Sequence, residues 1–341
     1  MASKLQGLKV LQTPYKTIAH HEIRTDVLVP EAPLSGKRPV IVRFHGGGLV
    51  SASLSPSHPS NTKQNTNRPQ IMGDSLYLPF YPQWLTDLAL AHGAIIISPN
   101  YRLLPEATTP QIFQDVADFW AYIHSPSLAS LLASQSPPVD ADLARVLVTG
   151  DSAGGLLCLS TALTYPRDMR VAVATYPLVD PSAPEFTTPR ENPPLGRSVP
   201  ESVYDDALAA AEGRPAESSV TSAARLDFML AATQHGRLGG LYARGLEDAA
   251  PAERRVYFPP EALEAEGVRL PVGGVTILQG RDDSVVPVES VRRFVKRARE
   301  VVGDEGVRLT ETDGEHGFDV ALRYDGWLKG ELKRAVDAWL E

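Results

Sequence analysis

Short apolar segments alternate with amphipathic ones along most of the chain. Residues 22–29 alternate polar and apolar side chains as a half-buried strand does, with Ile23, Val27 and Val29 on one side. Six further segments are short, rich in β-branched residues and mostly apolar on both faces, which is typical of strands in a parallel sheet covered by helices. These predicted strands are residues 40–44, 94–98, 145–149, 171–176, 274–279 and 306–310.

Helical patterns occupy the intervals between these strands. Residues 83–92, 112–124 and 153–165 fill the gaps between the early strands, and apolar side chains recur at helical spacing in 288–302 and 328–340. The repetition of strand, helix and strand predicts an α/β fold with a doubly wound, mostly parallel central sheet flanked by helices.

One long interval interrupts this alternation. Residues 177–273 separate two predicted strands, whereas an ordinary connection has about 2–6 residues. The interval opens with a proline-rich stretch and continues with helix-like patterns at 201–213 and 222–234. It therefore predicts an inserted helical lid. A second irregular stretch, residues 51–70, is polar and turn-rich and predicts a surface loop.

Composition and charge exclude several classes of function. No apolar run approaches the ~18 residues needed to cross a membrane, and no secretory signal is present, so the expected location is cytoplasmic. The formal charge of −8 gives no electrostatic footprint for nucleic acid, and the basic cluster within 292–299 predicts the solvated face of an amphipathic helix. The single cysteine, Cys158, excludes an intramolecular disulfide and a cysteine-based metal cluster, and is expected in the core.

The segment Gly150-Asp151-Ser152-Ala153-Gly154-Gly155 lies where a predicted strand meets a predicted helix. Gly-x-Ser-x-Gly at such a junction is the pattern of a nucleophile elbow, a sharp turn that exposes the serine hydroxyl above the sheet. Gly150 and Gly154 lack a Cβ atom, which lets strand and helix approach closely. The pentapeptide alone is equally compatible with a tight glycine turn that has no catalytic role.

Three further segments follow predicted strands. His45-Gly46-Gly47-Gly48 comes after residues 40–44, and its consecutive glycines offer backbone N–H groups for an oxyanion hole. Gly280-Arg281-Asp282-Asp283 comes after residues 274–279 and offers a carboxylate, and Gly314-Glu315-His316-Gly317-Phe318 comes after residues 306–310 and offers a histidine. Serine, aspartate and histidine in this chain order, each after a strand, indicate an α/β-hydrolase triad.

Four segments together resemble the hormone-sensitive lipase group of esterases, the α/β-hydrolase fold-3 family: HGGG, PNYRLLPE (99–106), GDSAGG, and GxxDxxVP paired with HGF. The match extends from His45 to Phe318. It implies an α/β-hydrolase fold whose lid combines the N-terminal segment with an insertion between strands six and seven. The expected division is an N-terminal segment with edge strands and part of the lid (1–37), a first part of the core (38–180), the inserted helical lid (181–271) and a second part of the core (272–341).

The resemblance also implies roles for individual residues. Ser152 would be the nucleophile, His316 the general base and then the general acid, and Asp283 the residue that orients His316. The N–H groups of Gly47, Gly48 and Ala153 would form the oxyanion hole.

Other residues of these motifs would support the site. His45 is expected to be structural, and Tyr101, Arg102 and Glu106 to brace the floor beneath the site by hydrogen bonds. The chain departs from the family in Leu104, where alanine is more common, and in a longer stretch at 51–75, which leaves the substrate preference open.

Two aspartates compete with Asp283. Asp282 adjoins it, but the spacing to Val286-Pro287 favours Asp283. Asp180 follows the strand before the insertion, where some α/β-hydrolases carry the acid, but its setting favours the start of the lid. The remaining histidines lack a glycine-flanked position after a strand and are expected to lie on the surface or in the core: His20, His21, His58, His92, His124 and His235. Neither a metal nor a cofactor is expected.

The expected function is hydrolysis of small to medium carboxylic esters through an acyl-enzyme intermediate. A small-molecule ester is the expected partner, and a homo-oligomer is compatible with the sequence. The same triad would also serve an acyltransferase, a lactonase or a cyclase acting on a specialised metabolite. A non-catalytic small-molecule receptor of this fold is a further alternative. The presence of His316 in its HGF motif disfavours it, because receptors that resemble this family have lost the triad histidine. A peptidase is disfavoured because a lidded pocket restricts access by polypeptides.

Overall fold

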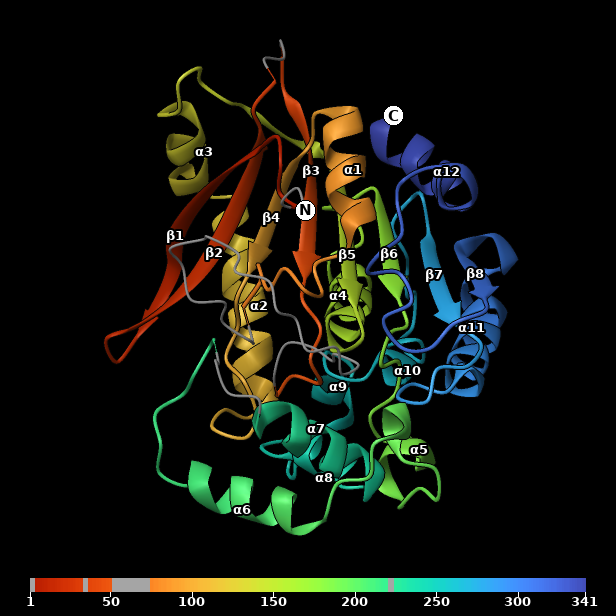
Figure 1. Ribbon diagram of the computed structural model, residues 1–341. Helices are drawn as coiled ribbons and strands as arrows, with labels where there is room; N and C mark the ends of the chain where they lie inside the picture. The colour runs from red at the N-terminus through yellow and green to blue at the C-terminus, as the bar shows by residue number, and fades with distance from the viewer. Residues whose placement is uncertain (1–3, 33–35, 51–73, 220–223) are drawn as a thin grey trace.

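Eight strands form one twisted sheet among the residues that the computed structural model describes, which are 4–32, 36–50, 74–219 and 224–341 (Figure 1). Their order across the sheet is β1-β2-β4-β3-β5-β6-β7-β8. The strands are β1 (Leu8–Ile18), β2 (His21–Pro30), β3 (Arg38–Phe44), β4 (Ile95–Pro99), β5 (Ala141–Asp151), β6 (Val171–Thr175), β7 (Val275–Gly280) and β8 (Val307–Thr312).

The sheet is mostly parallel, as the apolar strand pattern predicted. β2 pairs antiparallel with both β1 and β4, and all pairs from β4 through β8 are parallel. The hydrophobic pattern did not predict β1. This edge strand contains Lys9, Gln12, Pro14 and Lys16, and most of its side chains are partly or fully exposed, so it lacks the apolar run of a buried strand.

Helices cover both faces of the sheet. On one face α1 (Gln83–His92) and α12 (Gly326–Leu340) pack against the sheet around a core that includes Trp84, Ile41 and Trp339. On the other face the larger core joins the sheet to α2 (Thr109–Ile123), α3 (Pro126–Ala133), α4 (Ala153–Thr164) and α11 (Val288–Val302). This arrangement in three layers is the predicted α/β architecture. The short helix α3 was not predicted.

The chain between β6 and β7 forms a group of short helices beyond the carboxyl ends of the parallel strands (Figure 1). They are α5 (Pro184–Thr187), α6 (Ser202–Ala211), α7 (Ala224–Gln234), α8 (Leu238–Ala243), α9 (Pro251–Arg254) and α10 (Pro259–Ala262), with a 3₁₀ turn at Pro194–Gly196. The sequence predicted an insertion here, and α6 and α7 agree with the helical patterns at 201–213 and 222–234. Its role as a lid, with or without the N-terminal segment, stays a prediction.

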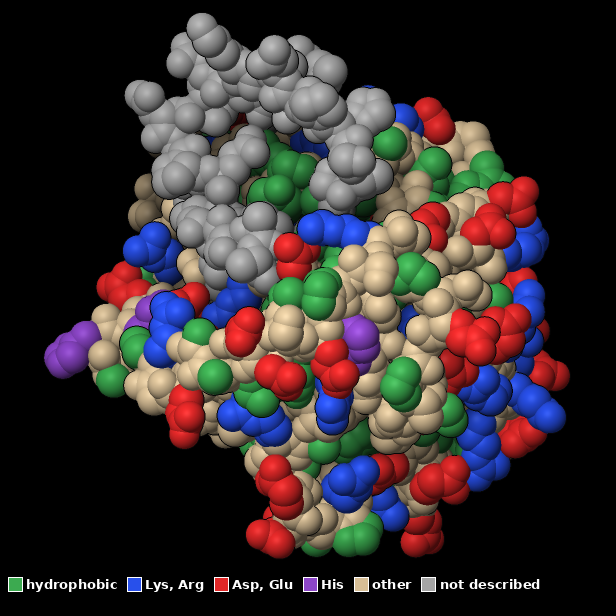
Figure 2. Space-filling view, turned by 60° about the horizontal axis from the view of Figure 1, so that its bottom comes forward, with side chains coloured by type: hydrophobic (Ala, Val, Ile, Leu, Met, Phe, Trp, Pro, Cys, Tyr) green, Lys and Arg blue, Asp and Glu red, His purple; other side chains and the backbone are tan. Residues whose placement is uncertain are grey.

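Surface features bear on three other predictions. The basic residues of α11 lie opposite its buried stripe and form ion pairs, for example Arg292 with Glu311 at 2.6 Å and Arg297 with Glu264 at 2.8 Å. Figure 2 shows acidic and basic side chains mixed over the face that carries the inserted helices. Within the described ranges no helix is long and apolar enough to span a membrane. The predicted surface loop at 51–70 lies outside the described residues. Of the longer stretch at 51–75, residues 74 and 75 are described.

Candidate active site

Ser152 lies at a sharp turn between β5, which ends at Asp151, and α4, which begins at Ala153. Its backbone has φ 56° and ψ −117°, a conformation that L residues rarely adopt and that is typical of strained functional turns. A Cβ atom at Gly150 would lie 2.1 Å from the Gly154 oxygen, and one at Gly154 would lie 2.2 Å from the Phe44 oxygen. Glycine is therefore required on both sides of the serine, as the sequence indicated.

The glycine loop after β3 lies against this turn. The Gly46 N–H donates to Asp151 Oδ2 at 2.9 Å, which joins the loop to the residue that precedes Ser152. Gly47 and Gly48 have φ values of 110° and 66°. Both glycines line the same pocket as Ser152 and His316, together with Phe80, Asp151, Tyr176 and Met229. The glycine loop and the serine thus line one pocket.

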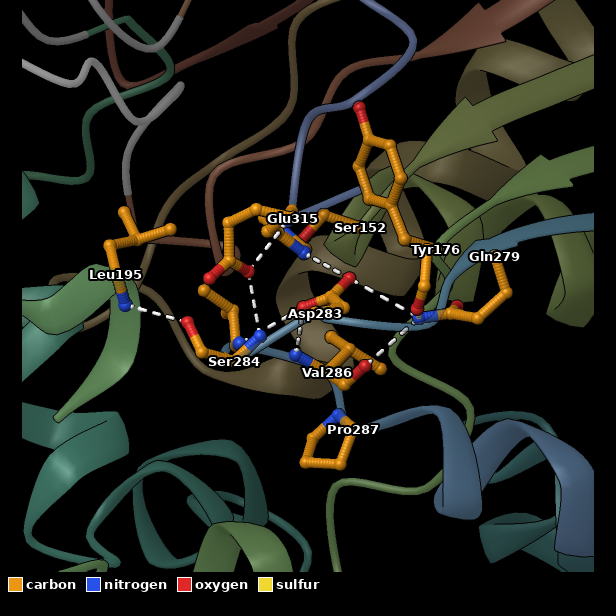
Figure 3. A network of polar contacts seen from close by, with 12 residues as sticks. Ser152, Tyr176, Leu195, Gln279, Asp283, Ser284, Val286, Pro287 and Glu315 are labelled. Atoms are coloured by element: carbon orange, nitrogen blue, oxygen red, sulfur yellow. Dashed lines mark hydrogen bonds and ion pairs between the residues drawn. The ribbon is translucent and has the colours of Figure 1, made fainter. Parts of the chain in front are cut away.

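Ser152, His316 and Asp283 form a continuous hydrogen-bonded chain, and two of these residues, Ser152 and Asp283, are labelled in Figure 3. His316 Nε2 lies 3.0 Å from Ser152 Oγ, and His316 Nδ1 lies 2.8 Å from Asp283 Oδ2. The three residues follow the ends of β5, β8 and β7. Their side chains meet because parallel strands end at the same edge of the sheet. With Nδ1–H donating to the carboxylate, Nε2 is left free to accept the serine proton.

The carboxylate of Asp283 is held from several sides. Its Oδ1 accepts hydrogen bonds from the N–H groups of Val285 and Val286 at 2.9 and 2.7 Å, and Oδ2 accepts a longer one from Gln279 Nε2 at 3.3 Å. The side chains of Asp283 and His316 are 0% and 4% exposed. These contacts fix the carboxylate in one orientation, with Oδ2 directed at the imidazole.

The rival aspartates point elsewhere. Asp282 Oδ2 accepts the Gly314 N–H at 3.2 Å, and Asp180 Oδ1 accepts the Ser182 N–H at 2.9 Å at the approach to α5. Neither carboxylate has a contact with His316 among those that the structure describes. Of the three aspartates, Asp283 is therefore the one that contacts His316 in the described part of the chain.

The expected bracing residues make contacts beneath and beside the pocket. Tyr101 stacks on His45 with 4.3 Å between ring centroids and donates its hydroxyl to the His45 carbonyl at 2.6 Å. Burial lowers the pKa of His45 to about 3, which keeps this imidazole neutral and suits a structural role. Arg102 binds buried Asp115 through Nε and Nη2 at 2.8 Å each, and Glu106 pairs with Arg225 of α7.

Sequence reasoning missed a buried network behind His316. The Tyr176 ring lies 4.5 Å from the imidazole of His316, and its hydroxyl donates to Asp319 Oδ1 at 2.7 Å. Trp84 Nε1 donates to Asp319 Oδ2 at 2.9 Å. Burial raises the pKa of both Tyr176 and Asp319. These residues join α1, the end of β6 and the histidine loop, which is the segment 313–325 between β8 and α12, through tertiary contacts that hydrophobic periodicity does not show.

A buried ion pair beneath the serine turn was also missed. Arg43 Nη2 lies 2.8 Å from Asp151 Oδ1, and Nη1 donates to the Ser75 carbonyl at 3.0 Å. The guanidinium lies 4.6 Å from the ring centroid of Tyr81. A charged residue inside the otherwise apolar run of residues 40–44 was the available signal. Since Asp151 Oδ2 also holds Gly46, Arg43 supports both the glycine loop and the serine turn.

Replacing Arg43 with methionine is expected to lower the free energy of unfolding by about 3–5 kcal/mol, because Asp151 would become a nearly buried carboxylate without its counter-ion. Urea unfolding of Arg43→Met measures the loss. The control is Arg308→Met, since the Arg308 side chain is 45% exposed and its pair with Glu331 is worth about 0–1 kcal/mol. Equal losses in the two variants would contradict a special role for the buried pair.

Comparisons with known proteins show which family this chain resembles. A family model described as alpha/beta hydrolase fold matches residues 75–231. A probable carboxylesterase M8 from Phoma sp. is 32% identical over 324 residues, which cover 92% of this chain and 91% of the relative. A probable carboxylesterase clz11 from Cochliobolus lunatus is 34% identical over 60% of this chain and 92% of the relative.

Solved structures show the same fold at low sequence identity. A Staphylococcus aureus protein of unknown function superimposes with a TM-score of 0.61 at 18% identity, covering 97% of this chain and 98% of the other. A butyrate-bound esterase 2 from Thermogutta terrifontis superimposes with a TM-score of 0.53 at 16% identity, covering 98% of this chain and 94% of the other.

Proposed function

Because this chain belongs to the α/β-hydrolase fold-3 family of hormone-sensitive-lipase-like esterases, we propose that it cleaves carboxylic esters with Ser152, His316 and Asp283 as its catalytic triad. The protein is a carboxylic ester hydrolase. The observation that carries this assignment is the unbroken chain of contacts from Ser152 Oγ through His316 to Asp283, at 3.0 and 2.8 Å.

Acylation comes first. His316 Nε2 takes the proton of the Ser152 hydroxyl as Oγ forms a bond to the ester carbonyl carbon. The resulting tetrahedral intermediate carries its negative charge on the former carbonyl oxygen. When the bond between this carbon and the alcohol oxygen breaks, the proton on Nε2 passes to the leaving alcohol, and the acyl group stays on Ser152.

Deacylation repeats the sequence with water. His316 Nε2 accepts a proton from water as the water oxygen forms a bond to the acyl carbon. Collapse of the second tetrahedral intermediate breaks the bond to Oγ, and Ser152 recovers its proton from the imidazole. Asp283 keeps the proton on Nδ1 and stabilises the imidazolium in both halves. The free enzyme and a carboxylic acid are the products.

We assign the oxyanion hole to the N–H groups of Gly47, Gly48 and Ala153. Gly47 and Gly48 belong to the loop joined to Asp151, and Ala153 begins α4, where the helix N-terminus favours negative charge. Amide groups of a fixed backbone need no reorganisation as charge develops, and one such donor is typically worth about 10²–10³ in rate.

The inserted helices are proposed to cover the pocket and to limit the substrate to small or medium esters. Met229 of α7 supports this, because it is buried and lines the pocket together with Ser152. A Cβ atom on Gly48 would lie 2.6 Å from Met229 Cγ, so the insertion packs directly on the glycine loop.

Covalent labelling tests the proposed nucleophile. A p-nitrophenyl phosphonate should release about one p-nitrophenol per chain, abolish hydrolysis of p-nitrophenyl butyrate and leave its phosphonyl group on the peptide that contains Ser152. The physical reason is that only an activated serine attacks phosphorus at a useful rate. Heat-unfolded protein is the control. Hydrolysis of the butyrate ester without labelling, or a label on another residue, would contradict the assignment.

A further inference from the structure

The loops that carry Asp283 and His316 lie side by side beyond the ends of β7 and β8. The Arg281 N–H donates to the Thr312 carbonyl at 2.8 Å, and the Asp282 N–H donates to the Gly314 carbonyl at 3.2 Å. A Cβ atom on Gly280 would lie 2.3 Å from the Gly314 oxygen, so the two backbones are in close contact. The pairing of the two strands thus continues for a few residues into the loops.

Beyond Asp282 the two loops are joined by the side chain of Glu315. Glu315 Oε1 accepts the Ser284 N–H at 2.6 Å and the His316 N–H at 2.7 Å (Figure 3). One oxygen atom therefore receives the N–H group of the residue after Asp283 and the N–H group of His316 itself. Backbone N–H groups at such positions need an acceptor, and a carboxylate is a strong one.

We propose that Glu315 is a positioning residue for ester hydrolysis, which fixes the separation of the aspartate loop and the histidine loop so that His316 stays aligned with both Asp283 and Ser152. The proposal rests on the triad proposed above. Asp283 and His316 are attached to different strands, so their 2.8 Å contact depends on how the two loops are held. A displacement of about 1 Å in a catalytic group can cost about 10²-fold in rate.

The aspartate loop has other attachments that should preserve the fold when Glu315 is changed. Arg190 Nη1 donates to the carbonyls of Ser284 and Val285 at 2.8 and 3.0 Å, and the Leu195 N–H donates to Ser284 Oγ at 2.7 Å. These contacts come from the inserted segment and do not reach His316. They hold one loop only, whereas Glu315 joins both.

Two substitutions separate the bonding role of Glu315 from its charge. Glu315→Gln keeps an acceptor oxygen at the same distance from the backbone but removes the charge, and Glu315→Ala removes the acceptor. We expect Glu315→Ala to lower kcat by about 10- to 100-fold with KM close to the parent value. Glu315→Gln should recover most of this loss. Rates are expressed per active site, counted by the phosphonate burst, with p-nitrophenyl butyrate as substrate.

The rate of phosphonate labelling provides a second readout, and it should fall in Glu315→Ala by the same factor as kcat. The matched control is Glu331→Ala, which also removes a partly buried glutamate with two contacts, to Arg308 and Thr310 at 2.8 Å each. It should leave kcat and the labelling rate unchanged.

Three results would overturn the proposal. A lower melting temperature of Glu315→Ala with parental kcat per active site would make Glu315 merely structural. Glu315→Gln as slow as Glu315→Ala would assign the effect to charge, and an equal loss in Glu331→Ala would make it nonspecific. Failure of the triad itself would appear separately, as parental activity in Ser152→Ala.

Discussion

Replacement of Ser152 by alanine is expected to lower kcat for p-nitrophenyl butyrate by about 10⁶-fold, to the limit of detection. The change removes one hydroxyl from a residue that is 9% exposed and leaves the glycines on both sides of the turn in place. No acyl-enzyme can then form, because His316 has no hydroxyl from which to take a proton. What activity remains would come from the oxyanion hole and from substrate binding, which act without a nucleophile.

Ser160→Ala is the matched control for this prediction. Ser160 is also a buried serine on α4, and its hydroxyl has no partner among the described residues. It should retain parental kcat and incorporate one phosphonate per chain, whereas Ser152→Ala should incorporate none. Both variants should melt within a few degrees of the parent protein. A folded Ser152→Ala protein that still hydrolyses the ester at more than about 1% of the parental rate would exclude Ser152 as nucleophile.

Most strands of the sheet could be predicted because buried parallel strands have a simple hydrophobic pattern in the sequence. Strands β3 to β7 each contain a short apolar run rich in β-branched residues, and β2 shows the alternation of a half-buried strand. The motifs at the strand ends were equally informative, since a parallel sheet brings successive carboxyl ends to one edge. Ser152, Asp283 and His316 could therefore be predicted to meet although 164 residues separate the serine from the histidine.

What the sequence could not reveal depends on contacts between elements. Tyr176 belongs to the run at the end of β6, and nothing in that run indicates that its ring lies against His316. Glu315 adjoins the predicted histidine, but its two backbone contacts require the loop after β7 to lie beside it. The hydrophobic pattern did not show edge strand β1 for a related reason, because an exposed edge strand has no continuous apolar pattern. Of these residues only Arg43 had a signal in the sequence, as a charge within the apolar run of residues 40–44.

Replacement of Asp283 by asparagine is expected to lower kcat by about 10⁴-fold with little change in KM. Asparagine retains the shape of the side chain and an oxygen that accepts the N–H groups of Val285 and Val286, which now bind Oδ1 at 2.9 and 2.7 Å. Its amide nitrogen, however, would lie where Oδ2 accepts His316 Nδ1–H. The imidazole would then favour the tautomer with its proton on Nε2, which cannot accept the proton of Ser152. The measurement is kcat and KM across pH 6–9.

The same experiment decides among the three aspartates that the sequence left in competition. Asp282→Asn retains an oxygen for the Gly314 N–H, and Asp180→Asn retains one for the Ser182 N–H, so neither change should disturb the imidazole. Both variants should keep kcat near the parental value. If Asp282→Asn or Asp180→Asn lost activity as strongly as Asp283→Asn, the contact at 2.8 Å between His316 and Asp283 would not identify the catalytic acid. A parental rate in Asp283→Asn would remove the carboxylate from the mechanism, because no second carboxylate contacts the imidazole of His316 in the described part of the chain.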